Sequence, residues 1–162
     1  MSPRAAWRLE SLGFGAVFDY TAGLADWMGA GLPIEGSTAR EARIGDVARQ
    51  DVPTCGPGER VGAVAERVRA AGWNTCLVVN ERGVILGRLY TEELEGDPKR
   101  TAEAAMRAGP STYRPDVAVA EMLERMEEEG LDTAPVTRSD GTLVGLVLRE
   151  DLRKLVGHRH VA

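Results

Sequence analysis

Cysteine, histidine and aromatic side chains are scarce in this chain of 162 residues, which has two cysteines, two histidines and 5% aromatic residues. Cys55 and Cys76 form no Cys-x-x-Cys motif and have no histidine near them in the sequence. A cysteine-based zinc site and a disulfide scaffold are therefore excluded. Both histidines, His158 and His160, are close to the C-terminus, so the chain has no Ser/His/Asp set. The chain lacks the sets of catalytic side chains that hydrolases and transferases commonly use, so we expect that it is not an enzyme.

Long apolar runs and an excess of positive charge are also missing. No stretch approaches the roughly 18–20 apolar residues that cross a bilayer, and the first residues lack the apolar stretch of a signal peptide. The net charge of −5 repels nucleic acid and anionic membranes. With 43% hydrophobic and 28% charged residues, the chain can bury a core. We expect a folded, cytoplasmic protein with neither nucleic acid nor a membrane as partner.

An internal repeat is the main signal in the sequence. Shifting the chain by 58 residues places residues 44–94 over residues 102–152 without a gap. Thirteen positions are then identical, and many others exchange one apolar residue for another. A repeat of this length is a whole supersecondary unit, and two copies are expected to share one core. The identical pairs include Thr54/Thr112, Val61/Val119, Gly72/Gly130, Thr75/Thr133, Gly87/Gly145 and Leu94/Leu152.

Each copy has the same order of predicted elements. An apolar stripe at helical spacing follows Pro57 or Pro115 and ends at Gly72 or Gly130, where a helix-terminating glycine belongs. Two short apolar strands follow, joined by a turn that contains a glycine, and a charged helix closes the copy. The sequence therefore predicts an α/β (α+β) fold built from two β-α-β-β-α units.

At these residues the chain resembles a tandem pair of CBS domains. The resemblance covers about residues 44–156 and rests on the closing Gly-x-x-x-x-x-[Asp/Glu]-Leu stretches and on the Pro135-Val136 strand. It implies two units packed sheet to sheet about a pseudo-twofold axis, with dimerisation through the helices. We expect the first unit at residues 37–96, the second at 97–157 and a tail at 158–162.

The CBS resemblance also implies a ligand cleft between the units, where adenine nucleotides or related adenosyl compounds such as AMP, ADP, ATP and S-adenosylmethionine bind. Asp151, and Glu93 in the first copy, are placed to accept hydrogen bonds from the ribose hydroxyls. The preferred cleft combines Asp151, Thr112 and Val136. The full set of candidate binding residues is Asp151, Glu93, Thr112, Thr54, Thr133, Pro135, Val136, Tyr90 and Arg149.

Two positions depart from the CBS pattern. The family commonly has a small hydroxyl residue three positions before the carboxylate, whereas this chain has Leu148 and Tyr90 there. Neither suits the same contact, although the Tyr90 phenol can donate from another direction. A carboxylate at a helix N-terminus is also stabilised by the helix dipole alone, by about 0.3–1 kcal/mol, so Asp151 has a purely structural explanation too.

Residues 1–36 lie outside the repeat. A short amphipathic helix ending at Gly13, a strand over residues 14–20 and a second short helix around Trp27 are predicted. Leu9-x-x-x-Gly13-Phe14 and Gly23-x-x-x-Trp27-x-x-x-Gly31-Leu32-Pro33 resemble the C-terminal third of a rhodanese domain. Rhodanese catalysis requires a cysteine upstream of this region, and the chain has none before Cys55. We expect the segment to pack on the CBS units or on a dimer partner.

These observations favour a non-enzymatic regulatory CBS pair, homodimeric, that binds an adenosyl ligand and changes conformation or its affinity for a separate protein partner. A ligand-free interaction scaffold is the alternative, and a sulfurtransferase is the least favoured reading.

Overall fold

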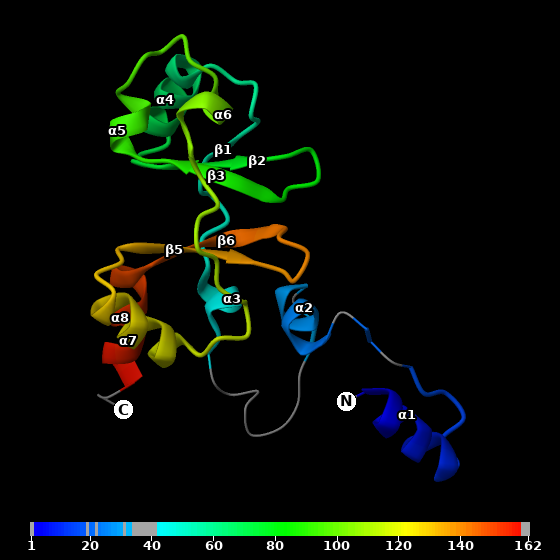
Figure 1. Ribbon diagram of the computed structural model, residues 1–162. Coiled ribbons are helices and arrows are strands. Elements are labelled where there is room, and N and C mark those ends of the chain that lie inside the picture. The colour runs from blue at the N-terminus through cyan, green and yellow to red at the C-terminus, as the bar shows by residue number, and fades with distance from the viewer. Residues whose placement is uncertain (1, 19, 22, 31, 34–41, 160–162) are drawn as a thin grey trace.

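The computed structural model of the protein describes residues 2–18, 20–21, 23–30, 32–33 and 42–159. Two α/β units lie one above the other, with their sheets facing and their helices outside (Figure 1). The predicted sheet-to-sheet pairing of two repeated units is therefore confirmed.

The first unit has a four-stranded sheet in the order β1-β2-β3-β4. β1 is parallel to β2, and the other neighbouring strands are antiparallel. Gly72 ends the first long helix with φ +74°, and Gly83 takes φ +77° in the hairpin turn, as the sequence predicted. The elements are β1 (Thr54–Cys55), α4 (Val61–Ala70), β2 (Cys76–Val79), β3 (Ile85–Leu89), α5 (Thr91–Leu94), α6 (Ala102–Ala105) and β4 (Arg107–Ala108).

The second unit has the same arrangement, except that single-residue bridges take the place of its two edge strands. β5 and β6 form an antiparallel hairpin, Tyr113 adds a parallel bridge to β5, and Arg49 adds an antiparallel bridge to β6. Its closing helix is longer than α5 and runs through Arg159, past the predicted start of the tail at residue 158. The elements are α3 (Ile44–Val47), α7 (Val119–Glu128), β5 (Thr133–Thr137), β6 (Leu143–Leu148) and α8 (Arg149–Arg159).

Each unit is completed by the leading segment of the other repeat. Ile44 of α3 is fully buried in the core of the second unit, together with Met122 and Met126 of α7. Conversely, Ala102 of α6 is buried in the core of the first unit, beside Val64 of α4. Figure 1 accordingly shows α3 below the lower sheet and α6 with the upper helices. The repeat locates these segments correctly but does not reveal that they cross over.

Two glycines permit this exchange because the crossing backbone passes directly over them. A Cβ on Gly145 would lie 2.7 Å from the carbonyl oxygen of Arg49, and one on Gly87 would lie 2.9 Å from that of Arg107. Gly87 and Gly145 are equivalent positions of the repeat. Both units therefore require a residue without a side chain at this point of the second hairpin strand.

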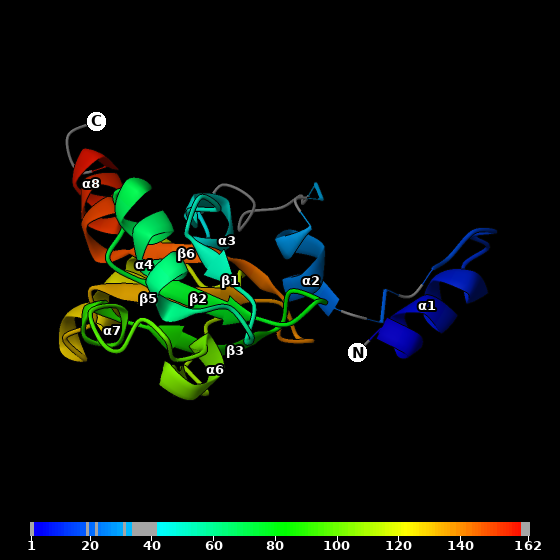
Figure 2. The ribbon, with the colours of Figure 1, turned by 90° about the horizontal axis from the view of Figure 1, so that it is seen from above.

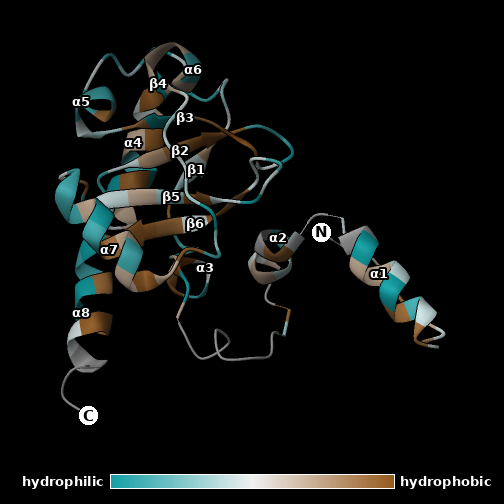
Figure 3. Cartoon of the chain, turned by 60° about the horizontal axis from the view of Figure 1, so that its bottom comes forward, coloured by the Kyte–Doolittle hydropathy of each residue, from teal (hydrophilic) through white to brown (hydrophobic). Residues whose placement is uncertain are grey.

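The interface between the units is apolar at its centre and continues into the hairpin turns. Val52, Leu77 and Leu146 form a buried cluster that joins the two sheets. At the turns, the amide of Ile85 donates to Gly141, and the amide of Leu143 donates to Gly83. Figure 3 shows the hydrophobic residues along β3 and β6, whereas α7 is largely hydrophilic. The acidic face of α7 is exposed, as expected from its charge.

The N-terminal segment forms the two predicted helices, α1 (Ser2–Ser11) and α2 (Gly23–Gly29). α2 docks on the second unit: Asp26 accepts from the backbone and hydroxyl of Ser139 at 3.0 and 2.5 Å, and Arg138 donates to the carbonyl of Gly29 at 3.2 Å. α1 lies apart from both units in two perpendicular views (Figures 1 and 2).

The strand predicted over residues 14–20 is not observed. Residues 14–18 and 20 belong to no strand, and the Phe18 side chain is 91% exposed. An alternating apolar pattern becomes a strand only where a neighbouring strand accepts its backbone hydrogen bonds, and this segment follows α1 away from both sheets. Within the described residues, no helix is long and apolar enough to span a membrane.

Candidate functional site

A cavity of about 700 Å³ lies between the two units, beside the N-terminus of α8. Its wall combines the segment entering the first unit, the turn after α4, the start of β5 and the junction between β6 and α8. The lining residues are Arg49, Asp51, Ala71, Gly72, Trp73, Asn74, Asp132, Thr133, Leu148, Arg149, Glu150 and Arg153. Residues of both repeats thus line one candidate site, between the units where the CBS resemblance implies a cleft.

Asp151 borders this cavity through an ion pair with Arg49. Its carboxylate accepts from Arg49 Nε at 2.8 Å, and the side chains are 26% and 46% exposed, respectively. The hydrogen bond to Asp151 raises the pKa of Arg49 above its ordinary value. Arg49 comes from the other repeat, where its backbone pairs with Leu146 of β6. The carboxylate expected to hold a ribose is therefore neutralised by a cation of the chain itself.

Trp73 supplies an aromatic surface on the first-unit side of the cavity. Its ring lies 5.8 Å from the guanidinium carbon of Arg49, so one arginine contacts both this ring and Asp151. Across the cavity, Arg149 pairs with Asp132, and Arg153 donates to Glu127 at 2.8 Å. The site thus offers a flat apolar ring and several guanidinium groups, which are suitable contacts for a purine and for phosphate oxygens.

Thr133 connects the cavity to a buried arginine of the first unit. The Thr133 hydroxyl accepts from Arg88 Nη2 at 2.5 Å, while Arg88 Nε donates to Thr75 at 2.8 Å. Thr75 and Thr133 are equivalent residues of the two repeats. Arg88 is only 5% exposed, and burial lowers its pKa from the ordinary value. One guanidinium therefore links the two units by bonding equivalent threonines of both repeats.

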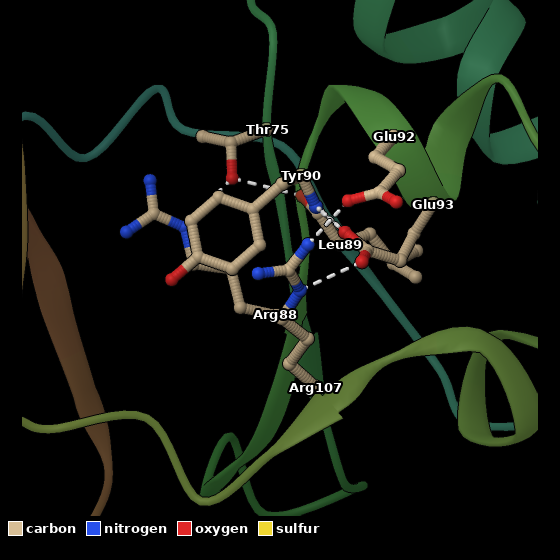
Figure 4. Close-up of polar contacts among 7 residues, drawn as sticks. All are labelled: Thr75, Arg88, Leu89, Tyr90, Glu92, Glu93 and Arg107. Atoms are coloured by element: carbon tan, nitrogen blue, oxygen red, sulfur yellow. Dashed lines mark hydrogen bonds and ion pairs between the residues drawn. The ribbon is translucent and has the colours of Figure 1, made fainter.

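On the opposite side of the interface, Tyr90 lies between two arginines. Its ring lies 4.5 Å from the guanidinium carbon of Arg88 and 5.0 Å from that of Arg107. Arg107 donates to Glu92 and Glu93 at 2.7 Å each (Figure 4). Burial raises the pKa of Glu93, but the bonds from Arg107 and from the amide of Tyr90 outweigh it and keep this pKa below its usual value. Glu93 also lines a smaller cavity of about 270 Å³ beside α5.

The structure divides the predicted binding residues among several places. Thr133 and Arg149 line the larger cavity, and Asp151 adjoins it. Thr112 is exposed and lies next to Tyr113, which pairs with β5, whereas Arg49 pairs with β6 at the other edge of the sheet. The combination of Asp151, Thr112 and Val136 is therefore not brought together in this cavity. Pro135 and Val136 are buried within β5, and Thr54 is exposed on β1.

Four residues at or near the candidate site were not predicted from the sequence as binding residues. Arg49 and Arg107 are identical across the repeat, which is a signal that could have suggested paired roles. Trp73 follows the glycine that ends α4, and only the fold turns it toward the interface. Arg88 gave no signal, because its equivalent in the second repeat is Leu146. The two cysteines lie in the core of the first unit, 3% and 0% exposed.

Comparison with known proteins identifies this two-unit arrangement. The CBS domain family model matches residues 44–94 and 102–158. The chain belongs to the CBS domain family. It is 29% identical over 121 residues to the uncharacterized protein MK0525 of Methanopyrus kandleri, an alignment that covers 70% of this chain and 62% of that protein.

Solved structures share the CBS-pair fold. The cytosolic domain of the Mg²⁺ channel MgtE in complex with ATP has a TM-score of 0.64 and 24% identity, covering 74% of this chain and 51% of that one. CBSX2 of Arabidopsis thaliana, solved in complex with AMP, has a TM-score of 0.65 and 16% identity over 74% of this chain and 98% of that one. The CBS pair of MJ0100, with 5′-methylthioadenosine and S-adenosyl-L-methionine, has a TM-score of 0.62 and 20% identity, with the same coverage.

Proposed function

We propose that this CBS pair is a non-enzymatic regulatory module that binds an adenine nucleotide or a related adenosyl compound in the cavity beside α8. The observation that carries the proposal is the cavity itself, since residues of both units line it and its volume of about 700 Å³ is within the usual range of small-molecule sites. The complexes of similar folds with ATP, AMP and S-adenosyl-L-methionine support this ligand class.

The side chains suit the parts of such a ligand. The Trp73 ring offers a stacking surface for adenine, and the hydroxyl of Thr133 offers a polar contact. Arg149 and Arg153 offer guanidinium groups to phosphate oxygens. Asp151 accepts ribose hydroxyls once Arg49 moves or shares its carboxylate, because the ion pair at 2.8 Å now uses that group.

Regulation follows from the position of the ligand between the units. A ligand that contacts both units favours one relative orientation, and a partner that prefers this orientation then binds more tightly. We further propose that the chain forms a homodimer and that a separate protein partner binds preferentially to one of its conformations.

Isothermal titration calorimetry of the purified full chain with ATP, ADP, AMP, S-adenosylmethionine and NADH tests the proposal. We expect saturable binding of at least one compound and at least a tenfold loss of affinity in Asp151→Ala. Glu81→Ala is the matched control, since it removes an exposed carboxylate in the β2–β3 turn. No saturable binding of any compound contradicts the ligand-binding function.

A ligand-free interaction scaffold is the second candidate. The contacts of the carboxylates favour it, because Asp151 is paired with Arg49, and Glu93 with Arg107. Leu148 and Tyr90 also replace the hydroxyl residues common in the family. If calorimetry detects no binding of any compound and analytical ultracentrifugation shows a stable dimer, the scaffold is favoured.

A further inference from the structure

The repeat predicts that the cavity beside α8 has a counterpart on the other side of the pseudo-twofold axis. The shift of 58 residues relates Leu148 to Tyr90, Arg49 to Arg107 and Thr133 to Thr75. The segments that build the first cavity therefore have equivalents, and the question is whether the second position is open to a ligand.

The side chains of the second position contact one another. The Tyr90 ring lies between the guanidinium groups of Arg88 and Arg107, at 4.5 and 5.0 Å, as Figure 4 shows. Arg107 is held in turn by Glu92 and Glu93. At the first position the equivalent of Tyr90 is Leu148, which is shorter and apolar. A cation–aromatic stack of the Tyr90 kind cannot form around it.

Arg88 makes the second position costly to open. Arg88 is only 5% exposed, and its guanidinium donates to Thr75 of its own unit and to Thr133 of the other unit at 2.8 and 2.5 Å. A ligand that displaced Tyr90 would remove a ring from this buried cation and disturb the link between the units. At the first position, the equivalent residue is Leu146, which belongs to the apolar cluster between the sheets and carries no charge.

We infer that this chain takes one ligand molecule, in the cavity beside α8, and that Arg88 and Tyr90 close the pseudo-symmetric position. The inference rests on the proposed ligand-binding function and adds its stoichiometry and the residues that set it. Arg88 and Tyr90 are selectivity residues: they decide which of two related positions accepts a ligand.

Calorimetry with AMP on the full chain tests the stoichiometry. We expect one AMP per chain in the wild type and two in the double variant Arg88→Leu/Tyr90→Leu, which carries at both positions the residues of the second repeat. Two AMP per wild-type chain, or one per chain in both proteins, would overturn the inference while leaving the proposed function intact. No saturable AMP binding would overturn the inference, and no saturable binding of any compound in the calorimetric panel would overturn the proposed function as well.

Photolabelling keeps the inference testable if the double variant fails to fold. Wild-type chain is irradiated with 8-azido-AMP, with and without excess AMP, and the labelled peptides are identified by mass spectrometry. AMP-protected label in residues 71–74 or 148–153 is expected. Protected label in residues 88–93 or 107–109 would show that the second position is open.

Discussion

At the residue scale, pairs of equivalent positions carry most of the architecture. Arg49 pairs with Asp151 and Arg107 pairs with Glu93, so each ion pair joins the start of one repeat to the closing helix of the other. Gly87 and Gly145 form another such pair, each under a crossing backbone. These pairs make the same contacts in both halves of the fold. Arg88 and Leu146 are also equivalent positions, but one is charged and the other is apolar.

Gly145→Ala tests the crossing directly. The new methyl group would lie 2.7 Å from the carbonyl oxygen of Arg49, and the backbone cannot move away without losing the bridge to Leu146. We expect a loss of about 1–3 kcal/mol in the free energy of unfolding, measured by urea denaturation.

Gly157→Ala is the matched control for that substitution. A Cβ at this position of α8 meets nothing within 4 Å, so the change should leave stability unaltered or raise it by up to about 1 kcal/mol. Equal losses in the two variants would contradict the close approach at Gly145.

At the element scale, the most distinctive feature is that one N-terminal helix contacts the CBS units and the other does not. α2 is fixed to the turn between β5 and β6 through Asp26, Arg138 and Ser139. α1 lies away from the units, and its Trp7 and Leu9 are 66% and 41% exposed, as is Leu12 directly after the helix, at 59%. The sequence gives these two helices similar short amphipathic patterns, so docking depends on specific polar contacts.

Docking of α2 should weaken in acid. The side-chain and backbone hydrogen bonds from Ser139 lower the pKa of Asp26 below its ordinary value of 3.8. Because the pKa of Asp26 is lower in the folded state, its ionised carboxylate stabilises the docked form at pH values above the unfolded pKa. This contribution is lost as the pH falls through the folded pKa. Amide hydrogen exchange in α2 should therefore accelerate as the pH falls below about 4, after correction for intrinsic rates.

Asp26→Ala should produce this change at neutral pH. Removing an exposed, charge-assisted contact costs about 1 kcal/mol, which corresponds to roughly fivefold faster exchange in α2. Exchange in β5 and β6 serves as the internal control. Unchanged protection of α2 in the variant would contradict the role of the Asp26–Ser139 contact.

At the scale of the whole molecule, the exchanged segments should make the two units one cooperative body. Ile44 completes the second core, Ala102 completes the first, and Leu146 joins the central cluster. Differential scanning calorimetry should therefore show one transition over the CBS pair, with equal calorimetric and van't Hoff enthalpies. Two resolved transitions would indicate that the units fold independently.

The sequence predicted the parts of this molecule that depend on local pattern. The helices that end at Gly72 and Gly130, the hairpins at Gly83 and Gly141, and the doubled α/β unit are all confirmed. Local pattern does not specify which half of the molecule a segment packs against, so the crossing of α3 and α6 was not predicted.

The site was predicted less completely, for a related reason. Of the residues predicted to bind a ligand, Thr133 and Arg149 line the cavity between the units and Asp151 adjoins it, and their binding role stays a prediction. The burial of Arg88 was not predictable, because a charged residue in a strand ordinarily faces water. Its environment arises only when β3 meets the threonines of both units.

The most direct test of the central claim is a fluorescence titration of Trp73, which lines the cavity. In the variant Trp7→Phe/Trp27→Phe, Trp73 is the one tryptophan that remains. Titration with AMP should change its emission saturably, and Asp151→Ala in the same background should weaken the response at least tenfold. If calorimetry detects AMP binding while the Trp73 emission stays constant, the ligand binds elsewhere and the account of the cavity is wrong.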